Sequence, residues 1–153
     1  MNNTNLIKEL ARLGKISEEK KNELEIQIEK SGEPEEDLLL KTKLVPEEEL
    51  FEIKSKLLNI PYTKLSKEEE IPLEVLELIS EEAAMNYKMI PLFKKGNTIG
   101  VGMVYPENIL AQNALRFLAN KGNFSYETYI ISQSDLNNVL KQYRTLTLET
   151  KKA

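Results

Sequence analysis

Apolar residues near the start of the chain recur at helical spacing. Leu6, Leu10 and Leu13 lie at i, i+4 and i+7, and Gly14 directly after them can adopt the left-handed backbone that ends a helix. Ser17 then offers a hydroxyl that can cap a second helix, formed by the run EEKKNELEIQIEK. Few apolar residues of this run share one helix face, so most of its surface is expected to face water.

Two further helices are predicted to begin at prolines. Pro34 and Pro46 suit the first turn of a helix, where the missing N–H would have no partner. Each is followed by three acidic residues, which are favourable at the positive end of a helix. The second of these helices has an apolar stripe made of Leu50, Ile53, Leu57 and Leu58.

The two helix pairs match each other at an offset of 29 residues. The positions that coincide are Leu10 with Leu39, Ile16 with Val45, Leu24 with Ile53, Ile28 with Leu57, and Glu18-Glu19 with Glu47-Glu48. A helix-turn-helix unit of this size cannot bury its own stripe, so the two copies are expected to pack on each other. We therefore predict a helical repeat subdomain over residues 1–60.

A period of two replaces the helical pattern between residues 89 and 105. Apolar side chains alternate along Ile99, Val101, Met103 and Tyr105, which is typical of a half-buried strand. The polar cluster of residues 94–97 before them predicts the turn of a β-hairpin. Gly100 and Gly102 occupy the opposite face of the strand, and because they lack side chains we expect a helix to pack closely there.

The remaining segments are predicted to cover this hairpin. Helices are expected after Pro72 and after the capping residue Ser80, and a third strand over residues 124–131. Between hairpin and third strand, a helix ending at Gly122 carries the apolar residues Ile109, Leu110, Ala114, Phe117 and Leu118. At the start of the last helix, Ser132 with Asp135 three residues on resembles a capping box.

The predicted fold class is therefore α+β. A helical subdomain of two helix-turn-helix repeats is followed, over residues 61–145, by a small α/β subdomain with a hairpin, a third strand and covering helices. Residues 146–153 have no evident core partner, so they are expected to form a linker or disordered tail.

Charge and composition exclude several function classes. The formal net charge of −4 argues against a nucleic-acid binder, which needs clustered Lys and Arg to neutralise phosphates. Cysteine and histidine are absent, which removes thiolate and imidazole metal ligands and the commonest general base. No apolar run approaches the roughly 18 residues of a membrane span. We expect a cytoplasmic chain with no metal site and no direct membrane insertion.

No catalytic constellation is evident in the sequence. It has no GxxxxGK[ST] phosphate loop, and GNTIGVG in the hairpin lacks the lysine and the strand-to-helix context of such a loop. The only aspartates, Asp37 and Asp135, are explained by helix starts. We therefore expect no enzyme activity and no catalytic residues in this chain.

From Leu44 to Tyr143 the chain resembles the N-terminal domain, also called MshEN, of the motor ATPases of bacterial type II secretion and type IV pilus assembly. The matching stretches are LVPEEELFEIKSKLLNIPY, IPLEVLELISEEAAMNYKMIPLFKKGNTIGVGMVYPENILAQNALRFL and SQSDLNNVLKQY. The resemblance implies a helical part followed by a small α/β part, placed before an ATPase core that this sequence lacks. It also implies partners: membrane-associated assembly proteins, which would recruit the domain to the inner membrane, and the ATPase core itself. A stand-alone adaptor is the alternative, and the sequence leaves open whether a core follows Ala153.

Some members of this family bind cyclic di-GMP through two copies of a motif that begins with Arg-Leu-Gly, one on each helical repeat. The first copy here has Asn5, Leu6 and Ile7 at those positions, and it keeps the later Leu10 and Gly14. These positions, Asn5, Leu6, Leu10 and Gly14, are the candidate binding residues that the resemblance implies.

The second copy of the motif departs further. Its first three positions hold Pro34, Glu35 and Glu36, and the later glycine and glutamine positions hold Lys43 and Leu57. Neither copy keeps the arginine that would stack on a base and pair with phosphate, and two glutamates would repel a diphosphate. We therefore expect no cofactor, and a cyclic di-GMP sensor with a degenerate motif remains the alternative to a docking domain.

Overall fold

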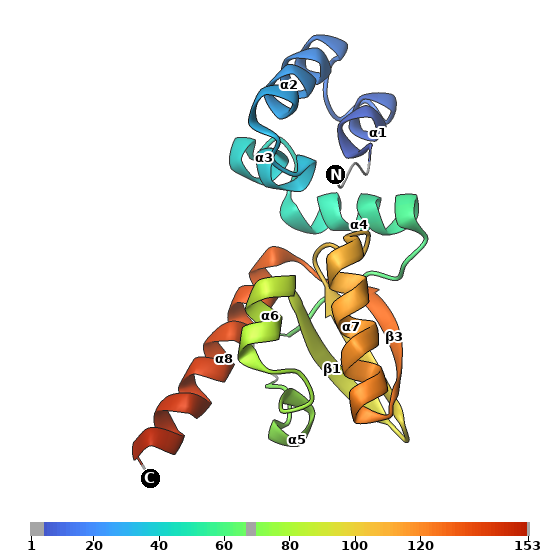
Figure 1. The fold of residues 1–153 in the computed structure, drawn as a ribbon. Helices are drawn as coiled ribbons and strands as arrows, with labels where there is room; N and C mark the ends of the chain where they lie inside the picture. Colours follow the sequence, from blue (N-terminus) through green and yellow to red (C-terminus); the bar gives the residue numbers. More distant parts are fainter. Residues whose placement is uncertain (1–4, 67–69, 153) are drawn as a thin grey trace. The chain divides into compact units, whose positions relative to one another are not determined.

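The computed structural model describes residues 5–66 and 70–152, and residues 146–152 by their backbone alone. The chain divides into two compact units, Met1–Asn59 and Ile60–Ala153. The first is helical and the second contains the sheet (Figure 1). This is the α+β architecture that the sequence predicted.

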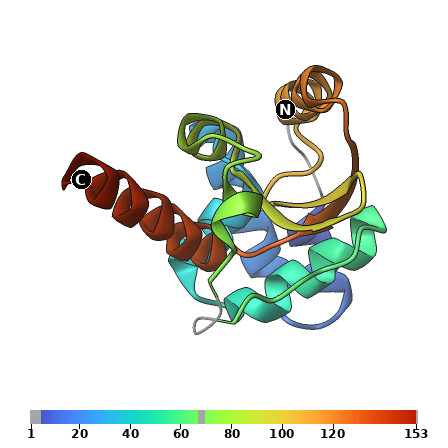
Figure 2. The same ribbon diagram turned by 90° about the horizontal axis from the view of Figure 1, so that it is seen from below.

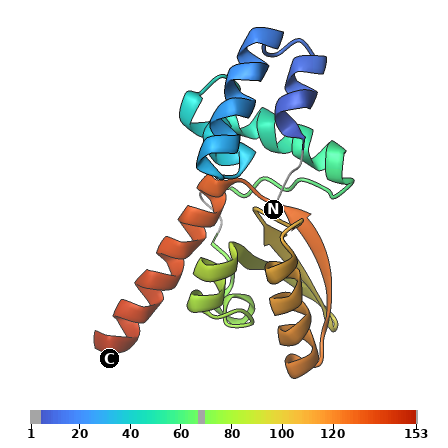
Figure 3. The same cartoon turned by 45° about the horizontal axis from the view of Figure 1, so that its top comes forward.

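The helical unit consists of two helix pairs. They are α1 (Leu6–Arg12) with α2 (Glu18–Ser31), and α3 (Glu35–Thr42) with α4 (Glu47–Leu58), seen together in Figure 3. The pairs begin at residues 6 and 18 and at residues 35 and 47, so the predicted offset of 29 residues is confirmed. Ser17 caps α2 by accepting a hydrogen bond from the Lys20 N–H at 3.0 Å.

The core of this unit draws on both repeats. Its buried members are Leu6, Ile7, Leu10, Ile16, Leu24, Leu38, Leu39, Val45, Leu50 and Ile53. One part of the predicted α4 stripe is wrong: Leu57 is exposed, and the buried face of α4 contains Phe51 and Lys54 besides Leu50 and Ile53. The predicted stripe contained only apolar residues, because a buried lysine such as Lys54 was not expected on this helix.

The second unit is built on a three-stranded sheet of order β1-β2-β3. Two short helices, α5 (Leu73–Leu76) and α6 (Glu81–Tyr87), precede β1 (Met89–Lys95) and β2 (Thr98–Met103), which pair antiparallel as the predicted hairpin. Helix α7 (Ile109–Gly122) then connects β2 to β3 (Ser125–Ile130), which lies parallel to β2. The last element is α8 (Gln133–Lys152).

The glycine face of β2 is covered differently from the prediction. The atoms nearest to a Cβ built on Gly100 belong to the ring of Phe93, which packs edge-on against Tyr129 with ring centroids 5.7 Å apart. The nearest atom to a Cβ on Gly102 is Ile131 Cγ2, at 2.7 Å. Side chains, not a helix backbone, therefore fill the space next to both glycines. Large residues on the same sheet can lean over a glycine, which the sequence pattern of one strand does not reveal.

Helix α7 turns a different face inward from the one predicted. Its buried residues are Ala111, Leu115 and Ala119, at i, i+4 and i+8. The prediction followed the larger side chains, and the structure buries the smaller set, which lets a crossover helix lie close to its neighbours. The helix ends at Gly122 as predicted, and Asn123 directly after it takes the left-handed conformation, with φ of 56°.

Helix α8 begins with half of the predicted capping box. The Asp135 N–H donates to Ser132 Oγ at 3.1 Å, as expected for an N-cap. The Asp135 carboxylate accepts a hydrogen bond from the Leu65 N–H at 3.0 Å. It therefore ties the start of α8 to the segment of the second unit that precedes α5.

Two further side chains of α8 hold the segment around α5. Gln142 accepts from the Ile71 N–H at 3.2 Å and donates to the Ile71 carbonyl at 2.6 Å. The Tyr143 hydroxyl lies 2.6 Å from the Ile79 carbonyl and 3.1 Å from the Leu76 carbonyl. Burial raises the pKa of the Tyr143 phenol, so the hydroxyl stays protonated and able to donate at neutral pH.

The expected linker over residues 146–153 is wrong as far as Lys152, because α8 runs to that residue and away from the sheet (Figure 2). No glycine or proline lies between Ser132 and Ala153 to end the helix, and each added residue gains one backbone hydrogen bond. In the part of the chain that the structure describes, no helix is long and apolar enough to cross a membrane.

Candidate functional site

The candidate residues of the first motif copy belong to the framework of the helical unit. Leu6 and Leu10 are fully buried in its core. Asn5 precedes α1 in a left-handed conformation with φ of 60°, and Gly14 follows the helix with φ of 77°. Helix packing and helix ends therefore account for Leu6, Leu10 and Gly14 without a ligand.

Glu35, in the second motif copy, is bound inside the same unit. Its two carboxylate oxygens lie 3.3 Å from the Leu6 nitrogen and 3.4 Å from the Ile7 nitrogen, so they accept hydrogen bonds from the first turn of α1. A carboxylate is favourable there because the first N–H groups of a helix have no partner within it. The side chain therefore serves as an internal anion that links the two repeats.

Glu36, the next motif position, forms a buried ion pair. Lys54 Nζ lies 3.1 Å from Glu36 Oε1, and the two side chains are 0% and 1% exposed. The ring of Phe51 lies 6.0 Å from the same ammonium group. A buried charge is tolerated only when paired, so both members of the pair are committed to the structure of the unit.

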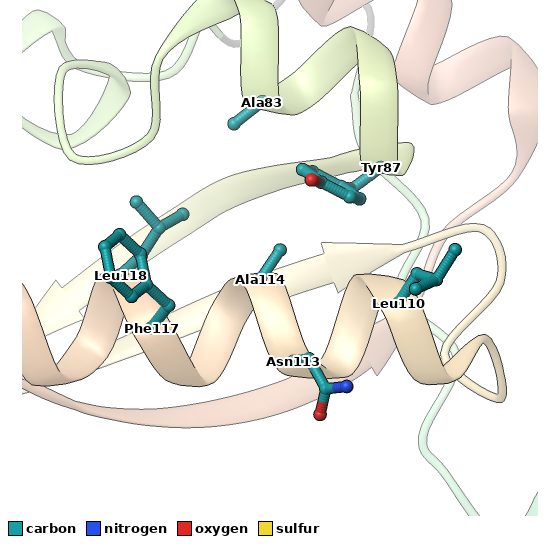
Figure 4. Close-up of a pocket in the computed structure, with 7 residues that line it drawn as sticks. All are labelled: Ala83, Tyr87, Leu110, Asn113, Ala114, Phe117 and Leu118. Atoms are coloured by element: carbon teal, nitrogen blue, oxygen red, sulfur yellow. The ribbon is translucent and has the colours of Figure 1, made fainter.

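A second candidate site is an apolar groove between α6 and α7 (Figure 4). Its lining comes from Ala83 and Tyr87 of α6 and from Leu110, Asn113, Ala114, Phe117 and Leu118 of α7, and its volume is about 420 Å³. Ala83 and Tyr87 project from α6 toward α7, as the close-up shows. Four of these α7 residues, Leu110, Ala114, Phe117 and Leu118, were predicted from the sequence to face the core.

Large apolar side chains of α7 at and beside this groove are unusually exposed to solvent. Ile109, Leu110 and Phe117 are 69%, 70% and 64% exposed, the highest values among the large apolar residues that the structure describes. Leu110 and Phe117 are seven residues apart, so they lie on the same helix face. Single exposed apolar residues are ordinary, whereas a cluster beside a groove marks an interaction site.

The charge of α7 differs from that of the other helices. Its sequence, ILAQNALRFLANKG, contains no acidic residue, whereas each of the other seven helices described here contains at least one. Arg116 and Lys121 are both exposed on it. In a chain with a net charge of −4, α7 is therefore a local basic surface.

Among residues 5–66 and 70–145, whose side chains the structure describes, no group of three or more carboxylate, histidine or cysteine side chains could hold a metal ion. No chemistry beyond binding is suggested by the lining of the groove, whose polar side chains are Asn113 and Tyr87.

Comparison with known protein families shows which family this chain belongs to. The model of the MshEN domain matches residues 58–150. This chain belongs to the MshEN domain family. The match covers the groove and all strands of the second unit, and it begins after most of the helical repeats that contain the degenerate motif.

Similar proteins agree with the MshEN assignment. The type IV pilus assembly ATPase PilB of Myxococcus xanthus is 25% identical over 134 residues, which are 88% of this chain and 23% of PilB. The chain thus spans about a quarter of the length of that relative. The structure of MshE with cdg has a TM-score of 0.75 at 19% identity, covering 90% of this chain and 97% of that one. The N-terminal domain of XpsE has a TM-score of 0.69 at 15% identity, covering 92% and 94%.

These comparisons confirm the predicted family and fold. At identities below 25%, the structural matches show the fold alone. The groove was not predicted, because the larger apolar residues of α7 were expected to lie in the core. One available signal was the second stripe, Ala111, Leu115 and Ala119, since two stripes on one helix cannot both face the same sheet.

Proposed function

We propose that this MshEN chain is a non-catalytic docking domain of a type II secretion or type IV pilus assembly ATPase. It would connect the motor to membrane-associated assembly proteins from the cytoplasmic side. The family and the similarity to PilB and XpsE support the setting. The observation that carries the docking role is the exposure of Leu110 and Phe117 on a folded helix, which leaves an apolar surface for a partner.

The test is a binding assay with the purified full chain as bait. The cytosolic domains of the assembly proteins encoded by the same organism are titrated one by one, for example by biolayer interferometry. We expect at least one domain to bind in the micromolar range or tighter, as specific protein contacts do. The matched control is the chain with Phe117→Ser, which should fold normally because the ring is exposed. If none of the assembly domains binds, the proposed docking function is wrong.

Cyclic di-GMP sensing is the second candidate, since the fold is shared with the structure of MshE with cdg. For this chain we predict no binding of cyclic di-GMP at tens of micromolar, measured by titration calorimetry. The leading motif positions hold Asn5 and Pro34 in place of arginines. Charge-assisted hydrogen bonds contribute roughly 1.5 to 3 kcal/mol each, so two lost arginines weaken binding by about two to four orders of magnitude.

The internal contacts of Glu35 and Glu36 strengthen this prediction. Both carboxylates are buried in the helical unit, so the two phosphodiester groups of cyclic di-GMP would have to displace or approach fixed negative charge. Asn5→Arg with Pro34→Arg is therefore expected to restore little affinity. Micromolar binding by the unchanged chain would contradict the prediction and favour a sensor.

A further inference from the structure

The lining of the α6–α7 groove has the spacing of a helix-packing site. Leu110, Asn113, Ala114 and Phe117 lie at i, i+3, i+4 and i+7 on α7. Four residues at this spacing form the hole that receives one side chain of a facing helix. The small side chain of Ala114 leaves space at the centre of this hole, and Leu110 and Phe117 form its two ends. The geometry of the α7 face therefore matches a helix better than an extended strand.

The groove offers little to a small polar ligand. Asn113 and Tyr87 are the polar side chains in its lining, and the other five lining residues are apolar. Small-molecule sites combine an apolar cavity with several convergent polar groups that fix orientation, and they enclose most of the ligand. Here Leu110 and Phe117 are mostly exposed to solvent. This is expected of residues in a protein–protein interface when the partner is not bound.

Charge indicates which helix would fit. Arg116 directly precedes Phe117, and Lys121 lies one helical turn beyond it, so both border the exposed apolar residues of α7. No acidic residue of α7 offsets them. Glu81 and Glu82 lie in the first turn of α6, the helix that forms the other wall of the groove. A partner helix is therefore favoured when its flank toward α7 is acidic.

We infer that the α6–α7 groove receives an amphipathic helix of another protein, with a large apolar side chain seated over Ala114 and an acidic flank beside Arg116 and Lys121. This inference rests on the proposed docking function and names the chemistry of the partner. Affinity comes from the apolar anchor between Leu110 and Phe117. Specificity and the rate of association come from the basic border, since complementary charge steers encounter more than it adds affinity.

The test uses two synthetic helical peptides of identical apolar spacing, one with glutamates and one with lysines on the flank. Each is titrated into the isotope-labelled full chain, and backbone amide shifts are followed by NMR. We expect the acidic peptide to shift amides of α6 and α7, and the basic peptide to bind at least about fivefold more weakly at low salt. Equal binding of both peptides, or shifts that avoid α6 and α7, would overturn the inference.

Three variants sharpen the experiment. Ala114→Leu fills the hole and should weaken the acidic peptide by about tenfold or more, the scale of losing a buried anchor. Arg116→Glu should reduce the preference for the acidic peptide. The matched control is Lys30→Glu, a charge reversal on α2, which should leave the preference unchanged. Thermal melts confirm that each variant is folded before it is compared.

Other occupants give distinct results. If α7 amides shift with protein concentration in the absence of peptide, and Ala114→Leu abolishes this, the groove binds a second copy and the inference of a separate partner is wrong. Binding of an assembly domain that is unaffected by Ala114→Leu and Arg116→Glu would sink the inference and leave the docking function standing. If the acidic peptide binds in the groove but no assembly domain binds the chain, the docking function is wrong and the inference about the groove stands.

Discussion

Lys54→Ala is expected to destabilise the helical unit by about 3 to 5 kcal/mol, the cost of removing one member of a buried ion pair. The change takes away the ammonium group 3.1 Å from Glu36 and leaves that carboxylate in the core without its cation. It also removes a fully buried aliphatic stem. The measurement is urea denaturation followed by far-ultraviolet circular dichroism, since the chain has no tryptophan to report by fluorescence.

A surface ion pair supplies the control for Lys54. Lys15 and Glu49 approach to 2.6 Å, with side chains 46% and 35% exposed. Lys15→Ala should therefore cost no more than about 1 kcal/mol. The double change Lys54→Met with Glu36→Leu should recover most of the lost stability, because apolar residues of similar size can replace a buried pair. Equal effects of Lys54→Ala and Lys15→Ala would show that the burial of the pair is not as described.

Gly102→Leu is expected to destabilise the second unit by about 3 kcal/mol, the upper range for overpacking. A Cβ at this position would lie 2.7 Å from Ile131 Cγ2 and 3.2 Å from Leu92 Cδ2. Ile131 is completely buried, so it cannot move toward solvent. Thermal melts of the variant and of the unchanged chain measure the difference.

Lys95→Ala is the control within the same hairpin. Its ammonium group lies 5.3 Å from the centre of the Phe93 ring, an exposed cation–π contact that contributes about 0.5 to 1 kcal/mol. Gly100→Ala should fall between the two variants, because the Phe93 ring that it would meet is half-buried and can turn away. A larger loss for Lys95→Ala than for Gly102→Leu would refute the packing described around Gly102.

Local signals predicted much of the fold. The hydroxyls of Ser17 and Ser80 cap helices as expected, because an N-cap depends only on residues three positions apart. The hairpin and the offset of 29 residues were also accessible, since both rest on periodicity within short windows. These features depend on neighbours in sequence, which a single chain displays in full.

The features that escaped prediction depend on distant residues. Glu35 was expected at the positive end of its own helix, and its bonds to α1 join residues 28 and 29 positions apart. The buried pair of Lys54 and Glu36 was not predicted, because no local pattern shows that these two side chains would meet in the core. On α7, the larger apolar residues were predicted to lie in the core, whereas Leu110 and Phe117 are exposed. The candidate site was not predicted for that reason, because its largest residues were taken for core residues.

The contacts of α8 have a mechanical consequence. At about 1.5 Å per residue the helix is roughly 30 Å long. Three of its side chains form hydrogen bonds with Leu65, Ile71 and Ile79, and these are Asp135, Gln142 and Tyr143. All three lie in the first eleven residues of the helix. The later turns extend beyond these bonds and beyond the buried residues Leu136, Val139 and Leu140. A force applied at the far end of the helix would therefore reach the second unit through these hydrogen bonds and this apolar packing together.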